Sequence, residues 1–238
     1  PLNFQLELDE AQTNLFDKAL SRLQQNEPLQ YIVASTEFYG FPFQLSPAVL
    51  IPRPETEELV DWIYTDFKNT SCTILDIGTG SGAIAVSLAK LLPEAKVTAI
   101  DVSEDALKIA EANASSNAVN VQFIKQDILD CQALDRSYDV IVSNPPYVRD
   151  LEKVEIKANV LNYEPHLALF VEDQNALIFY KKIAELAIKA LQPNGILYFE
   201  INQYLSAETV SLLKNIGFSQ VELRDDFAGK PRMIKAQR

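Results

Sequence analysis

Residues 73–85 read TILDIGTGSGAIA, and this stretch decides the fold. An apolar run at 73–77 ends in a glycine-rich turn, after which apolar residues recur at helical spacing. The chain has only seven glycines, and Gly78, Gly80 and Gly82 are three of them. Glycine at a strand-to-helix turn lets the backbone bend tightly and approach a ligand. We therefore expect a ligand-binding turn at the carboxyl edge of a parallel sheet.

From residue 73 onward, short apolar runs alternate with longer amphipathic ones. The predicted strands are 73–77, 96–100, 121–125, 139–143, 195–200, 218–224 and 231–236, and the predicted helices are 82–92, 103–117, 174–191 and 204–216. This alternation is typical of an α/β protein with a mostly parallel sheet and helices on both of its faces.

The segment before residue 73 lacks this alternation of strand and helix patterns. Residues 9–25 predict a peripheral amphipathic helix. Five prolines interrupt residues 28–54, where aromatic and β-branched residues favour short extended pieces or a hairpin. A helix is expected to begin at Pro54, with the carboxylates that follow it placed at its positive end. We thus expect a short N-terminal helical and hairpin segment before the sheet domain.

Composition excludes several classes of protein. The net charge of -12, from 33 acidic and 21 basic residues, disfavours duplex nucleic acid as a partner. No window resembles a membrane span or a secretory leader, so we expect a cytoplasmic protein, and we expect a monomer. Cys72, Cys131 and the single His166 are too few for a disulfide framework or a metal site.

The fourth predicted strand ends in SNPPY, residues 143–147. The side-chain oxygen of Asn144 and the carbonyl of Pro145 can accept both N–H groups of a planar amino or carboxamide nitrogen. Pro145 and Pro146 restrict the backbone, so these acceptors are largely pre-organised. Tyr147 offers a flat face for stacking on a base or an amide plane. This arrangement suits the orientation of a nitrogen toward a methyl donor.

The ligand of the glycine-rich turn is open on the motif alone. GTGSGA also satisfies the dinucleotide fingerprint, and Asp101 lies 21 residues after Gly80, close to the spacing of a ribose-binding acid. Asp76 and Asp127 add carboxylates at two further strand ends. An anionic pyrophosphate is repelled by such carboxylates, whereas a sulfonium cofactor with an amino-acid tail tolerates them. The pattern therefore favours a sulfonium cofactor with an amino-acid tail over a dinucleotide.

Together these motifs resemble the class I S-adenosylmethionine-dependent methyltransferases, with their Rossmann-like fold. The resemblance implies S-adenosylmethionine as the cofactor and S-adenosylhomocysteine as its product. YIVASTEFYGFPFQLSPAVLIPRPETEELV, residues 31–60, and YEPHLALF, residues 163–170, are similar to segments of the HemK/PrmC family, the protein-(glutamine-N5) methyltransferases of peptide chain release factors. The resemblance covers residues 27–238. It implies a remnant of an N-terminal helical substrate-binding domain at 1–26, a linker and hairpin at 27–54, and the methyltransferase domain at 55–238.

The resemblance also implies roles for individual residues. The cofactor site would comprise Asp76, Gly78, Thr79, Gly80, Ser81, Gly82, Asp101, Val102, Asp127, Ile128 and Asn144. In it the glycine-rich turn lines the methionine part, Asp101 holds the ribose, and Asp127 with Ile128 lies by the adenine. Residues 144–147 would clamp the glutamine amide of a Gly-Gly-Gln loop in the release factor. Arg53 would lie at the rim of the site, or else pair with Glu55 or Glu57.

The sequence departs from this family at three places. Only about 26 residues precede the linker, so the N-terminal domain is expected to be truncated or incomplete. Ile128 replaces an aromatic residue of some members, which predicts apolar packing on the adenine. Asn202 stands where the family tends to have glycine. Because Asn tolerates left-handed backbone better than most residues, we expect the turn to be kept.

Three alternatives remain open at this point. An adenine-N6 nucleic-acid methyltransferase could use the same clamp, although the net charge and the lack of a basic stripe argue against it. A dinucleotide-dependent oxidoreductase leaves the NPPY motif unexplained. A binding module without turnover would retain the cofactor fold, and the intact clamp argues against that reading.

Overall fold

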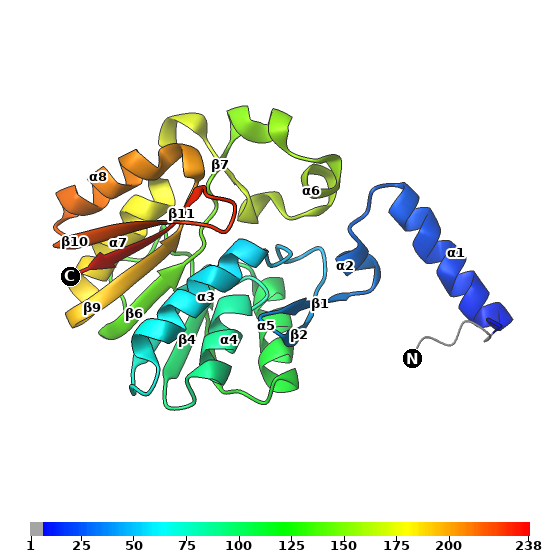
Figure 1. Cartoon of the computed structure of the whole chain (residues 1–238), viewed down its shortest axis with the longest axis horizontal. Helices are drawn as coiled ribbons and strands as arrows, with labels where there is room; N and C mark the ends of the chain where they lie inside the picture. The colour runs from blue at the N-terminus through cyan, green and yellow to red at the C-terminus, as the bar shows by residue number, and fades with distance from the viewer. Residues whose placement is uncertain (1–6) are drawn as a thin grey trace.

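The structure is a computed structural model that describes residues 7–238 (Figure 1). Its centre is a seven-stranded sheet with the spatial order β10-β11-β9-β6-β3-β4-β5. The strands are β3 (Thr73–Ile77), β4 (Lys96–Asp101), β5 (Val121–Lys125), β6 (Tyr138–Ser143), β9 (Leu191–Glu200), β10 (Gln220–Asp225) and β11 (Pro231–Gln237). All seven predicted strands are confirmed, with ends that differ by a few residues.

The sheet is parallel except at one edge. Strands β3, β4, β5, β6 and β9 pair in parallel, whereas β11 is antiparallel to β9 and β10 is antiparallel to β11. The chain adds strands outward from β3 through β4 to β5, then returns to place β6 on the other side of β3. This reversal opens a crevice at the carboxyl ends of β3 and β6, where open α/β sheets bind ligands.

Helices cover both faces of the sheet, as predicted. Ile74 and Val140 pack in one core with helices α3 and α4, whereas Leu75 and Ile141 pack in the other with α7 and α8. Successive strand residues thus alternate between the two cores, because side chains along a strand point to opposite faces. The helices are α3 (Pro54–Phe67), α4 (Ala83–Leu91), α5 (Glu104–Ser116), α7 (Ile178–Ala190) and α8 (Ser206–Ile216).

The N-terminal segment forms the helix and the hairpin that the sequence predicts. Asp9 caps α1 (Glu10–Gln24) by accepting a hydrogen bond from the backbone of Gln12. Helix α1 buries none of its residues and projects away from the sheet (Figure 1). After the short α2 (Leu29–Ile32), strands β1 (Ser35–Phe38) and β2 (Phe41–Gln44) pair antiparallel and pack on α5 through a hydrogen bond from Gln44 to Asn113. None of the helices within residues 7–238 is long and apolar enough to cross a membrane.

The sequence analysis missed the short elements between β6 and α7. They are β7 (Val148–Arg149), η1 (Asp150–Glu155), α6 (Ala158–Tyr163), η2 (His166–Ala168), β8 (Phe170–Val171) and η3 (Asp173–Asn175). Because η3 forms a 3-10 turn, α7 begins at Ile178 instead of the predicted residue 174. This segment brings residues 163–170 to the crevice, so it contributes to the site described below.

Asn202 does not use the left-handed backbone that asparagine tolerates. Its backbone is extended, with φ -66° and ψ 123°, because the turn after β9 needs no left-handed residue. Its side chain instead caps η4 (Gln203–Leu205) by accepting from the backbone of Tyr204, and it donates to the carbonyl of Tyr147. Asn202 therefore ties the end of β9 to the NPPY segment.

Candidate active site

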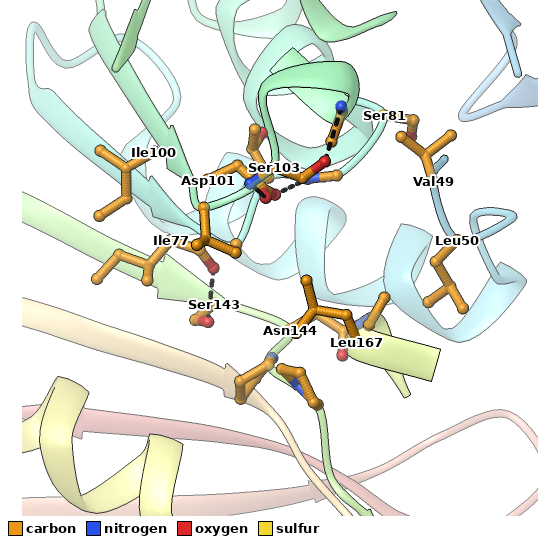
Figure 2. Close-up of a pocket in the computed structure, with 18 of the residues that line it drawn as sticks. Val49, Leu50, Ile77, Ser81, Ile100, Asp101, Ser103, Ser143, Asn144 and Leu167 are labelled. Carbon is orange, nitrogen blue, oxygen red and sulfur yellow. Dashed lines mark hydrogen bonds between the residues drawn. The ribbon is translucent and has the colours of Figure 1, made fainter. Parts of the chain in front are cut away.

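A cavity of about 440 Å³ lies at the carboxyl ends of β3, β4 and β6. Its size is within the range of small-molecule sites. Figure 2 shows Asp101 and Asn144 on different sides of the cavity, with Leu167 beside Asn144. The predicted site residues that line it are Arg53, Gly78, Thr79, Gly80, Ser81, Asp101, Val102, Asp127, Ile128, Asn144, Pro145 and Pro146.

The glycine-rich turn uses its backbone donors to hold its own shape. The N–H groups of Gly78 and Thr79 donate to the carbonyl of Ile100, and that of Gly80 donates to Asp101 at 2.8 Å. Gly78 and Gly80 have φ values of 74° and 55°, and a Cβ on either would meet no atom within 4 Å. The turn is therefore a smooth cradle against open space, with these three donors already engaged.

Gly82 has a different role from the other two glycines. A Cβ there would lie 3.1 Å from Cβ of Ala110 on α5. Gly82 is not among the residues that line the cavity. Its lack of a side chain therefore lets α4 and α5 approach each other, so it shapes the site indirectly.

Asp101 connects the turn to the second strand of the sheet. Its carboxylate accepts from the backbone of Gly80 and from that of Ser103, both at 2.8 Å. Burial raises its pKa, and the backbone hydrogen bonds from Ser103 and Gly80 oppose that shift. Since a carboxylate offers about four lone-pair sites, Asp101 keeps acceptor capacity for hydroxyl groups of a ligand.

Asp76 lies beneath the turn and does not line the cavity. It is fully buried, and its Oδ2 accepts from the hydroxyl of Thr79 at 2.6 Å. Its Oδ1 has no hydrogen-bond partner within the described chain, and burial raises its pKa to about 7. The structure therefore places Asp76 as a support of the turn, and direct contact with a cofactor stays a prediction.

The charges around the cavity discriminate between cofactors. The charged residues that line it are Arg53, Asp101, Asp105 and Asp127. Arg53 is paired with the carboxylate of Glu164 at 2.6 Å, so the remaining charges are acidic. A pyrophosphate binds to free backbone donors and cations, whereas the N–H groups of Gly78, Thr79 and Gly80 are engaged and the unpaired charges at the cavity are carboxylates. The residues thus fit a cationic sulfonium ligand better than a dinucleotide.

The residues predicted to lie by the adenine, Asp127 and Ile128, line the cavity close to Asp101. Asp127 is exposed and accepts from the backbone of Leu129 at 2.8 Å, which forms a local turn after β5. Ile128 is buried beside it and lines the cavity. An apolar side chain at this position is consistent with packing against a flat ring.

The NPPY segment brings Asn144, Pro145 and Pro146 to the cavity, but Tyr147 turns away. Its hydroxyl donates to Glu200 at 3.1 Å, and its ring packs against the core beneath the sheet edge. Burial, above all, raises the pKa of Tyr147. Stacking of Tyr147 on a substrate stays a prediction that this geometry does not favour.

Asn144 and Pro145 line the cavity, and within the described chain each has a free acceptor oxygen. Its Nδ2 donates to Oγ1 of Thr56 at 3.4 Å. Within residues 7–238, neither its Oδ1 nor the carbonyl of Pro145 accepts a hydrogen bond. Two acceptors next to a small-molecule cavity can hold the two N–H groups of an amide or amine.

The sequence analysis did not assign Glu164, Thr56 and Glu200 to this site. Arg53 pairs with Glu164, not with Glu55 or Glu57, so that expectation is wrong. Thr56 lines the cavity from the first turn of α3, and Glu200 lies buried behind it. The carboxylates of PETEE, residues 54–58, predict the start of a helix. They do not predict which way Thr56 points, because that depends on how α3 packs on the sheet.

Comparison with known sequences identifies close relatives. Residues 68–225 match the family described as a methyltransferase domain. The chain is 54% identical over 234 residues to the release factor glutamine methyltransferase of Flavobacterium psychrophilum, a match that covers 97% of this chain and 82% of the relative. It is 48% identical over 223 residues to the enzyme of the same name from Bacteroides thetaiotaomicron, covering 93% of this chain and 80% of that protein.

Solved structures share the fold at low sequence identity. A methyltransferase from Pyrococcus furiosus superposes with a TM-score of 0.62 at 21% identity, covering 93% of this chain and 98% of that one. The 16S rRNA N2 G1207 methyltransferase of Thermus thermophilus, solved in complex with AdoMet and guanosine, gives a TM-score of 0.63 at 18% identity, covering 86% and 49%. These matches confirm the predicted Rossmann-like methyltransferase fold.

Proposed function

The chain belongs to the release factor glutamine methyltransferases, and from that premise we propose how its cavity performs methyl transfer to a release factor. S-adenosylmethionine is the proposed methyl donor. The acceptor is the side-chain amide nitrogen of the glutamine in the Gly-Gly-Gln loop of a class 1 peptide chain release factor. Such a substrate implies a cytoplasmic enzyme, and a monomer suffices because one chain supplies all of the proposed site.

The observation that carries this proposal is the position of Asn144. Its free Oδ1 and the free carbonyl of Pro145 lie at the same cavity as Asp101 and the glycine-rich turn. Acceptors for a planar nitrogen and a cradle for a methyl donor therefore share one space of about 440 Å³. A dinucleotide enzyme does not need acceptors for a planar nitrogen. A binding module without turnover does not need those acceptors next to the cradle for a methyl donor.

In the proposed complex, S-adenosylmethionine supplies an activated methyl group on its sulfur. Asp101 would accept hydrogen bonds from the ribose hydroxyls, and residues 78–81 would border the methionine part. Asp127 and Ile128 border the adenine. The carboxylates near the cavity favour a cationic ligand over an anionic one.

Asn144 and Pro145 orient the substrate nitrogen. Each accepts one N–H of the glutamine amide, so the plane of the amide and the direction of attack are fixed before transfer. As the new nitrogen–carbon bond forms and the methyl–sulfur bond breaks, positive charge develops on the nitrogen and both oxygens stabilise it. One of the two amide protons is then lost to water. The rigid prolines limit backbone reorganisation, so little conformational freedom is lost at this step.

The test is transfer of labelled methyl from S-adenosylmethionine to three substrates in parallel. They are a release factor, the same factor with the loop glutamine replaced by alanine, and an adenine-containing oligonucleotide. Label on the intact factor alone supports the proposal. Label on the oligonucleotide alone would favour the adenine-N6 alternative, and no label on any substrate would contradict both.

A further inference from the structure

A buried carboxylate lies directly behind the Asn144 clamp. Strands β6 and β9 are parallel neighbours, and their register pairs Ser143 with Phe199. The next residues, Asn144 and Glu200, therefore lie side by side at the carboxyl ends of these strands. Glu200 is 1% exposed and does not line the cavity, so it touches no ligand there. A buried charge next to the site calls for an explanation, because its desolvation is unfavourable.

Glu200 accepts hydrogen bonds through both of its oxygens. Its Oε2 accepts from the hydroxyl of Thr56 at 2.6 Å, and its Oε1 accepts from the hydroxyl of Tyr147 at 3.1 Å. The shorter distance is typical of a hydroxyl bound to an ionised carboxylate. Burial, above all, raises the pKa of Glu200, and the hydrogen bonds from Thr56 and Tyr147 and the charge of Arg232 oppose that shift. The carboxylate thus holds the proton of Thr56 in one direction.

The hydrogen bond from Thr56 to Glu200 determines how Thr56 can bond to Asn144. A hydroxyl has one proton, and that of Thr56 points to Glu200. Toward Asn144 its Oγ1 can therefore only accept, and Nδ2 of Asn144 lies 3.4 Å from it. That hydrogen bond is long, but the reverse orientation of the amide would place two lone-pair oxygens against each other. Thr56 is 3% exposed, so water does not replace it in this role.

We propose that Thr56 and Glu200 are positioning residues that fix the side-chain amide of Asn144 with Oδ1 toward the substrate, and that this orientation selects glutamine over glutamate. The inference rests on the proposed function, since it assigns the selectivity of that same clamp. A glutamine amide brings two N–H groups to two acceptors. A glutamate carboxylate brings only lone pairs, which the two oxygens repel. If Asn144 could turn its amide over, its Nδ2 would donate to that carboxylate and the discrimination would weaken.

The experiment compares the full chain with three variants. Thr56→Val removes the hydroxyl and keeps the shape of the side chain, whereas Thr56→Ser keeps the hydroxyl. Thr209→Val is the matched control, because Thr209 is a fully buried helical threonine on α8 whose hydroxyl donates to Leu205, outside the cavity. For each protein, we would measure turnover on the release factor, and the ratio of its affinities for the factor with glutamine and with glutamate in the loop.

We expect Thr56→Val to lower kcat about tenfold and to narrow the glutamine-to-glutamate affinity ratio about tenfold, the scale of one hydrogen bond in a protein. Thr56→Ser should recover most of both losses. Thr209→Val should lose thermal stability at most, with turnover and ratio as in the parent. Only the affinity ratio separates orientation from packing, because a packing defect weakens the binding of both loops alike.

Two results would overturn the inference. One is an unchanged affinity ratio in Thr56→Val, whatever happens to kcat, since the amide would then be fixed without Thr56. The other is a Thr56→Ser protein as impaired as Thr56→Val, which would trace the effect to the methyl group. A parent protein that methylates no release factor would contradict the proposed function itself, and the inference with it. The parent's own activity thus distinguishes the two failures.

Discussion

Arg53 and Glu164, which are 111 residues apart in the sequence, form an ion pair of 2.6 Å at the cavity. The side chain of Glu164 is 0% exposed, and its second oxygen accepts from the backbone of Ile51 at 3.1 Å. One carboxylate therefore joins the segment before α3 to the segment after α6. Leu50 and Pro52 on one side, and Pro165 on the other, line the cavity, so this junction shapes its wall.

We expect Glu164→Ala to lower the free energy of unfolding by about 1–3 kcal/mol, because it removes a buried acceptor that serves a charged group and a backbone N–H. Glu164→Gln should cost less, since its oxygen can still accept from Ile51. Urea unfolding of the variants would measure this. Glu27→Ala is the matched control, because it breaks an arginine–glutamate pair near the end of the exposed helix α1. Equal effects at both positions would show that Glu164 does not join the two segments.

Asn144→Ala should lower turnover about 100-fold, the scale for one removed group that stabilises developing charge. The affinity for S-adenosylmethionine should change little, because the clamp acts on the substrate nitrogen. Calorimetric titration and methyl-transfer kinetics on the same preparations would separate the two. Asn215→Ala, an exposed position on α8, serves as the control. A matching loss of cofactor affinity would count against the clamp.

Asp101→Asn should weaken S-adenosylmethionine binding by about 1–3 kcal/mol, because the amide replaces an acceptor oxygen with a donor. The same change at Asp105 also removes one negative charge at the cavity, but Asp105 is exposed and paired with Lys108 at 2.9 Å. Asp105→Asn should therefore affect binding much less. Equal losses in the two variants, measured by titration, would mean that general charge and not hydrogen bonding holds the cofactor.

The residues that the sequence predicted are those whose role follows from local chain chemistry. Gly78 and Gly80 need left-handed backbone, and Asn144 follows a strand directly, so short motifs reveal them. Glu164 and Glu200 act through contacts 111 and 144 residues away, to Arg53 and to Thr56. No local pattern signals such pairs, because the sheet topology alone brings them together.

Tyr147 and Asn202 show a second reason why the role of a residue could not be predicted from the sequence. The motif suggests an aromatic face for the substrate, but the hydroxyl of Tyr147 finds its partner in the interior, at Glu200. Asn202 was judged by backbone preference, whereas its side chain makes hydrogen bonds to Tyr147 and Tyr204 that decide its conformation. In both cases a polar group beside the core satisfies its hydrogen bonds first, and this requirement overrides the preference of the isolated residue.

The buried Asp76 predicts an unusual pH dependence of stability. Burial, above all, raises its pKa in the folded protein from 3.8 to about 7. Between these values the folded state binds more protons at this group than the unfolded state, so the contribution of Asp76 to stability is complete below pH 3.8 and falls as the pH rises through 7. Asp76→Asn does not titrate. Relative to the parent, this variant should therefore gain stability between about pH 4 and pH 8, by roughly 2–4 kcal/mol at most.

Denaturant unfolding of both proteins at several pH values would measure the difference between their free energies of unfolding. The titration of all groups that the two proteins share cancels in this difference. The absolute stability of the variant is not the readout, because its amide N–H₂ takes the place of an oxygen that lacks a partner in the folded chain. What matters is the slope of the difference with pH. A difference that stays flat from pH 4 to pH 8 would mean that Asp76 is ionised in the folded protein, and that the turn above it stabilises the charge at least as much as burial opposes it.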